Sequence, residues 1–242
     1  MGLVSFALVL LGARLLRLSR RSGQEPERWL GFAFSSAGAS AWLLPLAASG
    51  ALTPETSRLV ALAAQVGMTG AVCSFALFTW RVFRAGSVPA RWLALGLIVA
   101  NVAAAGGVVA SGTPVPTGSI GLVLVLGRCG ALLWLFFESA VCAQRARRRL
   151  QLGLADPILA NRFLLWTIWT GALAVIPLFV LALRAVGALA APVPGAPLPQ
   201  LLVAVLATLG AGGAAAAVAV WLAFFPPPAY QRWVSAGAAR AT

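Results

Sequence analysis

The stretch that decides the fold runs from Gly118 to Cys142, GSIGLVLVLGRCGALLWLFFESAVC, and carries only two charges, Arg128 and Glu138. Four arginines follow it closely: Arg145, Arg147, Arg148 and Arg149. A run of about 20 apolar residues crosses the hydrocarbon core of a bilayer as a helix. The helix satisfies its own backbone hydrogen bonds, which lipid cannot do. The stretch therefore predicts a transmembrane helix that ends at a basic cluster.

The rest of the chain repeats this pattern. Of the 242 residues, 61% are hydrophobic and 10% charged, and the mean hydropathy is +0.93. Soluble domains have about a quarter charged residues, so this chain has too few charges to cover a water-facing surface. We predict an all-α, polytopic membrane protein, a seven-transmembrane-helix bundle that forms one domain over residues 1–242. The predicted helices are 3–18, 29–49, 59–80, 92–111, 118–142, 163–185 and 198–225.

The arginines set the predicted orientation. They gather in the first, third and fifth connections and in the C-terminal tail, whereas the other connections hold Arg58 and Arg184 against Glu55. Cytoplasmic connections of membrane proteins carry the excess of positive charge, so we expect an N-out/C-in topology. The first apolar run precedes its arginines, which is the reverse of a cleaved signal peptide. We expect it to be retained as a helix, with Arg14 and Arg17 reaching the headgroups.

The basic composition points to a membrane surface as the partner. The net charge of +13 would suit nucleic acid, but the arginines lie at the ends of apolar runs, where they fix topology. We therefore expect no nucleic-acid partner, and expect the cytoplasmic arginine clusters to contact anionic lipid. A cytoplasmic or membrane protein partner stays open. All 18 basic residues are Arg, and Ala and Gly are abundant, which suggests a GC-rich bacterial genome and an inner-membrane location.

The chain lacks the residues that several kinds of membrane enzyme and cofactor protein need. The chain has no His, which excludes bis-histidine haem, serine–histidine hydrolysis and histidine-coordinated zinc. It has no Lys for a retinal Schiff base, and Glu138 is its only acid within a predicted span, where a carboxylate pair needs two. The three cysteines show no C-x-x-C spacing. We expect no enzymatic activity, no cofactor and no metal.

Arg128 is the candidate centre of a ligand site. It lies about ten residues into its predicted helix, near the bilayer midplane, where a charge is costly and should face the bundle interior. Polar and aromatic residues at similar depth would make a pocket for a carboxylate or phosphate. The predicted ligand-binding set is Arg128, Gln65, Thr69, Asn101, Trp134, Trp169 and Thr170. The alternative is a structural role, in which amide and carbonyl oxygens satisfy Arg128 and hold the helices together.

Glu138 is the second intramembrane charge. It is ten residues after Arg128, which is about 15 Å along a helix and roughly 80° around it, so we do not expect the two to pair. Arg145 lies two turns later on the same face, and Arg162 begins the next helix. We predict a cytoplasmic ion pair from Glu138 to one of these arginines. The pair would be a structural contact or a gate whose rupture reports a conformational change.

Some segments resemble known proteins. The seven-helix, N-out/C-in layout resembles that of receptors and opsins. Three stretches are similar to segments of uncharacterised bacterial seven-helix membrane proteins: Glu27–Gly31, Gly153–Pro157 and Asn161–Trp166. They cover a small part of the chain and imply no activity.

Three functions are compatible with these patterns. The first is a receptor-like sensor, or small-ligand or lipid-binding component, that acts through a separate partner, because the tail from about Pro226 is too short for an output domain. The second is a small-solute or lipid transporter with Arg128 at the midplane. No internal repeat is evident, although many transporters have one. The third is a structural subunit of a membrane complex.

Overall fold

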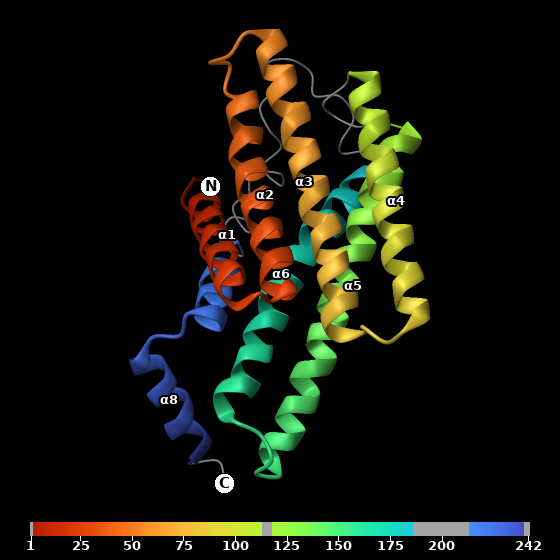
Figure 1. The fold of residues 1–242 in the computed structure, drawn as a ribbon. Helices are drawn as coiled ribbons and strands as arrows, with labels where there is room; N and C mark the ends of the chain where they lie inside the picture. Colours follow the sequence, from red (N-terminus) through yellow and green to blue (C-terminus); the bar gives the residue numbers. More distant parts are fainter. Residues whose placement is uncertain (1, 113–117, 186–212, 240–242) are drawn as a thin grey trace. The chain divides into compact units, whose positions relative to one another are not determined.

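The computed structural model describes residues 2–112, 118–185 and 213–239, and within them every regular element is a helix (Figure 1). The labelled helices are α1 (Gly2–Ser22), α2 (Glu25–Ala48), α3 (Pro54–Phe83), α4 (Val88–Ser111), α5 (Gly118–Gln151), α6 (Pro157–Ala185) and α8 (Pro228–Ala239). A further helical segment, Gly213–Phe224, directly precedes α8.

Five described helices, α2 to α6, are long and apolar enough to cross a membrane. The count becomes six if Gly213–Phe224 and Pro228–Ala236, which are bent by 88° at their break, form one span. The chain is thus a helical membrane-spanning protein. α1 is not among the five, and four arginines lie in its second half. In the predicted helix 198–225, residues 198–212 lie outside the described part of the chain.

The helices begin and end at residues suited to that task. Thr53 accepts a hydrogen bond from the Thr56 amide at the start of α3, and Ser87 accepts one from Ala90 at the start of α4. Such caps satisfy amides that have no partner within the helix. A proline follows each capped start, which suits the first helical turn. α4 ends at Gly112, whose φ of 63° is the left-handed conformation that glycine adopts readily.

The chain divides into two compact units. The first unit comprises Met1–Leu132 and Pro177–Ala190, and the second comprises Leu133–Ile176 and Ala191–Thr242. α5 and α6 therefore contribute residues to both units, and the boundary within α6 falls at Pro177. A proline inside a helix removes one backbone hydrogen bond and bends the helix.

In the first unit, α1, α2 and α3 pack in sequence order through small residues. A Cβ at Gly12 of α1 would lie 2.6 Å from the Ser35 amide nitrogen of α2, and one at Gly38 would lie 2.7 Å from the Ser5 carbonyl oxygen. Gly31 of α2 meets Leu16 in the same way. Lipid is as apolar as leucine, so helices in a membrane associate through such close backbone approach. Glycine at these positions permits the α1–α2 contact.

The core of the first unit continues into the first half of α5. One buried cluster joins Leu62, Ala104, Val108 and Leu124 from α3, α4 and α5. A second joins Val72, Ala76 and Ala131. The two clusters hold the first half of α5 against α3 and α4, and this packing sets the depth of Arg128.

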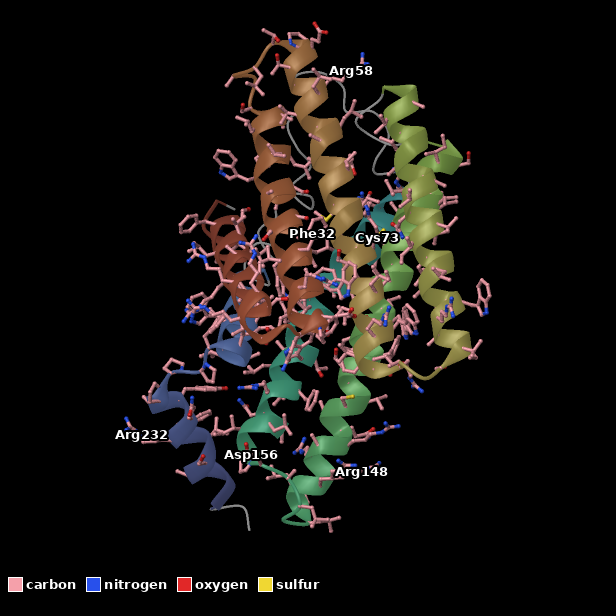
Figure 2. All side chains as sticks on the ribbon, in the orientation of Figure 1. Phe32, Arg58, Cys73, Arg148, Asp156 and Arg232 are labelled. Carbon is pink, nitrogen blue, oxygen red and sulfur yellow. The ribbon has the colours of Figure 1, made fainter. Side chains whose placement is uncertain are left out.

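Arg58 lies near the start of α3, whereas Arg81 lies in the last turn of that helix. Figure 2 labels the Arg58 side chain. A Cβ at Gly112 would lie 2.7 Å from Arg58 Nη2, so the guanidinium rests on the C-terminal end of α4. That end carries a partial negative charge from unpaired carbonyls. A local structural role therefore accounts for an arginine that the charge pattern alone leaves as an exception.

In the second unit, aromatic rings join α6 to Gly213–Phe224. The Trp166 ring lies edge-on to Trp169, with centroids 5.6 Å apart, and its centroid lies 5.4 Å from that of Phe224. Trp169 is 1% exposed. After Phe224 the prolines Pro226 to Pro228 end the helix, and α8 begins at the last of them. Proline lacks the amide hydrogen needed to continue a helix, which explains the 88° turn.

Candidate ligand-binding site

The first unit brings Arg128 of α5 against Gln65 of α3. Arg128 Nη2 donates a 2.9 Å hydrogen bond to Gln65 Oε1, across 63 residues of sequence. The contact forms because Leu62 and Leu124, one turn before each residue, pack in the same buried cluster. Two members of the predicted ligand-binding set therefore touch directly.

Asn101 of α4 lies beside the same region. Its side chain is 1% exposed, and its Nδ2 donates a 2.8 Å hydrogen bond to the Leu97 carbonyl of its own helix. A Cβ at Gly127 would lie 2.7 Å from Asn101 Nδ2, so the amide is seated against the residue that precedes Arg128. A glycine at 127 is what allows α5 to approach this amide. A third member of the predicted set thus packs against Gly127, the residue that precedes Arg128.

Two buried polar atoms in this group have no hydrogen-bond partner in the described chain. They are Arg128 Nε, a donor, and Asn101 Oδ1, an acceptor. In the described residues no carboxylate lies within 4.0 Å of the Arg128 guanidinium, the distance that defines an ion pair. An unsatisfied buried polar group costs about 1–3 kcal/mol, more if charged. The group can thus still offer a donor to an anion and an acceptor to an N–H or O–H.

Thr69 belongs to the same stripe of α3 but has a local partner. Its Oγ1 donates a 2.9 Å hydrogen bond to the Gln65 carbonyl one turn earlier. Threonine in an apolar helix commonly satisfies its hydroxyl in this way. The hydroxyl keeps acceptor capacity, since it has two lone pairs and only one proton. Thr69 therefore supports the backbone at Gln65, and its contact with a ligand stays a prediction.

Trp134, Trp169 and Thr170 belong to the second unit. Trp134 Nε1 donates a 3.3 Å hydrogen bond to Glu138 Oε1, one turn later in α5. Thr170 Oγ1 donates to the Trp166 carbonyl at 2.9 Å, and Thr170 is fully buried. The participation of these three residues in a site with Arg128 stays a prediction.

The hydrogen bond between Trp134 and Glu138 was not predicted from the sequence. The two residues are four apart on one helix, the spacing at which side chains meet, so the signal was present in the sequence. The prediction for Glu138 named arginines, because a positive charge stabilises a carboxylate within a membrane. The ion pair or gate from Glu138 to Arg145 or Arg162 stays a prediction.

A contact between α6 and α8 was also not predicted, and here the sequence carries no signal for it. Asn161 Nδ2 donates a 2.8 Å hydrogen bond to Tyr230 Oη, and the two residues are 69 apart in sequence. Gln231 Nε2 donates a 2.9 Å bond to the Pro226 carbonyl at the bend. A small pocket opens beside these contacts, and Arg162 is among the residues that line it.

Comparison with known proteins adds no relative. No protein-family model, no curated protein and no solved structure matches the chain.

Proposed function

We propose that this chain is a non-enzymatic, receptor-like sensor of the bacterial inner membrane, which binds a small carboxylate- or phosphate-bearing ligand at Arg128 and acts through a separate partner. The observation that supports the proposal is the incomplete pairing of Arg128. Its guanidinium has one neutral amide partner, Gln65, and a buried Nε without any described partner. A charged side chain within a membrane-spanning helix is costly, and one without a charged partner is commonly functional.

The ligand chemistry follows from the atoms on offer. A guanidinium recognises carboxylate and phosphate through paired, charge-assisted hydrogen bonds. The unpartnered Asn101 Oδ1 would accept a hydrogen bond from the same ligand. The proposed ligand is thus a small acid that carries a neighbouring N–H or O–H group.

The proposal includes the topology. Seven spans would be α1 to α6 and 198–225, with the N-terminus outside and the C-terminus inside. α1 has 21 residues and is about 32 Å long, which matches the hydrocarbon thickness. Arg14 and Arg17 would then extend to the cytoplasmic headgroups, since long basic side chains reach the interface, and Arg20 and Arg21 at the end of the helix would lie among them.

The experiment uses two substitutions with different expected effects on folding. Arg128→Gln removes the charge, and Gln65→Glu keeps the shape of the partner while supplying the guanidinium with a carboxylate. The purified protein is heated in detergent with short-chain carboxylates and phosphate monoesters as probes. A ligand at 100 times its Kd raises the stability of the wild type by about 2.7 kcal/mol. Both variants should lose this gain, and Gln65→Glu should fold at least as stably as the wild type.

Two results would oppose the proposal. If no probe stabilises the wild type and Arg128→Gln collapses, Arg128 holds the helices together and the structural-subunit function is favoured. If probes stabilise the wild type and Gln65→Glu equally, they bind elsewhere. Density for a bound metabolite beside Arg128 in an experimental structure would support binding directly.

A further inference from the structure

We propose that the crevice between α6 and α8 is a specific seat for the phosphate group of an anionic phospholipid, with Arg162 as its principal ligand. The polar side chains of the crevice are Asn161, Arg162, Tyr230 and Gln231. The inference concerns the second unit only and does not depend on the proposed function of Arg128.

The crevice lies at the ends of two helical segments, where the proposed topology places the headgroups. Its α6 residues belong to the first three turns of the helix, and Pro226 lines it at the bend that follows Phe224. α6 is long and apolar enough to cross a membrane, and Gly213–Phe224 passes the same test together with the start of α8. Apolar residues such as Leu165 and Leu222 also line the crevice, so polar and apolar walls stand side by side. That combination matches the boundary between a headgroup and its acyl chains.

The size of the crevice decides between a lipid and a free metabolite. Its volume is about 10 Å³, which accommodates about one water-sized group. A soluble ligand needs a site that buries most of its surface. Here only one or two oxygens of a ligand could be held, with the remainder outside. A phospholipid meets this condition, because its acyl chains are already bound by the bilayer and only the phosphate requires a seat.

The charge around the crevice favours an anion. Arg162 is exposed along the crevice wall and, within the described chain, has no hydrogen-bonding or ionic partner. Arg232 projects from α8, and Arg148 belongs to the last turn of α5 (Figure 2). Asp156 is the one acid of the α5–α6 connection. Anionic lipids gather at such basic surfaces, and Arg162 adds the paired donors of its guanidinium to that diffuse attraction.

Three contacts give the seat its shape. Asn161 holds the Tyr230 hydroxyl, and Gln231 bonds the Pro226 carbonyl. α8 is thereby fixed against α6 beside Arg162. Tyr230 Oη accepts the bond from Asn161 and keeps its own proton, which it can donate to a phosphate oxygen.

The test is native mass spectrometry of the detergent-purified full chain with equal amounts of phosphatidylglycerol or phosphatidylethanolamine. We expect the first phosphatidylglycerol to bind more tightly than phosphatidylethanolamine. Arg162→Gln should weaken it about 10- to 100-fold, the value of a charge-assisted hydrogen bond. The matched control is Arg148→Gln, an exposed arginine outside the crevice, for which a loss of at most about fivefold is expected from diffuse attraction.

A second variant guards against an effect of Arg162 on folding. Val234→Glu places a carboxylate on the crevice wall and should also weaken phosphatidylglycerol selectively, with unchanged helical circular dichroism. Equal losses for Arg162→Gln and Arg148→Gln would overturn the seat in favour of diffuse attraction. Competition by free glycerol phosphate at the lipid's own binding concentration would overturn the lipid in favour of a soluble anion.

Discussion

The contact between α1 and α2 allows a stability prediction to be worked from the structure. In Gly12→Ala the new methyl group would lie 2.6 Å from the Ser35 nitrogen and 2.7 Å from the Gly31 oxygen. Both atoms are backbone of α2, so no side-chain rotation relieves the clash. Carbon atoms in packed proteins rest at about 3.5–4.0 Å from their neighbours. The two helices must therefore separate by several tenths of an ångström or more.

This separation sets the expected loss. Overpacking of a well-packed contact costs about 1–3 kcal/mol, and the movement would also loosen the contact of Gly31 with Leu16. The alanine itself favours the helix by up to about 1 kcal/mol. We expect a net destabilisation of about 1–2 kcal/mol for Gly12→Ala.

The matched control is Gly106→Ala. Gly106 lies on an exposed face of α4, and a Cβ there meets nothing within 4 Å. This variant should be neutral or slightly stabilised, because only helix propensity changes. The assay is thermal unfolding in detergent, read by the fraction of protein that stays monodisperse. Equal melting curves for the two variants would refute the reasoning that the glycine permits close helix approach.

Three further outcomes are expected from the same unfolding assay. Gln65→Leu removes the amide partner of Arg128 and should destabilise the protein by about 1.5–3 kcal/mol, the value of a hydrogen bond to a charged group; an unchanged curve would show that Arg128 has other partners. Tyr230→Phe removes the acceptor for Asn161 and should lower the free energy of unfolding by about 0.5–1.5 kcal/mol. Asn161→Ala added to Tyr230→Phe should lower it little further if the two residues act only through each other. Arg58→Ala should cost about 0.3–1 kcal/mol in low salt and less in high salt, and a loss independent of salt would contradict the interaction with the end of α4.

The helices could be predicted because apolar run length is a strong signal for a membrane helix. The predicted helix 59–80 lies within α3, Pro54–Phe83, and 163–185 lies within α6, Pro157–Ala185. The differences are at the ends. Helices continue beyond the hydrocarbon until a cap or a glycine stops them, and α3 starts at the Thr53 cap with Pro54 in its first turn.

The site was predictable only in part. The Arg128–Gln65 contact followed from depth, because intramembrane polar residues seek one another. The pairing of Asn161 with Tyr230 did not, since helix periodicity says nothing of how two distant segments meet. α8 was missed as a separate helix because an 88° bend depends on backbone geometry at the prolines. The division into two units likewise follows from packing, and the only sequence feature at its boundary in α6 is Pro177.

The central claim is that the apolar helices lie in a bilayer with the arginine-rich ends on one side. The most direct measurement uses a variant without the three native cysteines, into which Ala51→Cys or Leu154→Cys is introduced. Ala51 lies exposed between α2 and α3, and Leu154, which is 73% exposed, lies between α5 and α6. In intact cells whose outer membrane is permeable, a maleimide that cannot cross the inner membrane should label Cys at 51, and should label Cys at 154 only after lysis. Labelling of both positions from the same side would contradict the account.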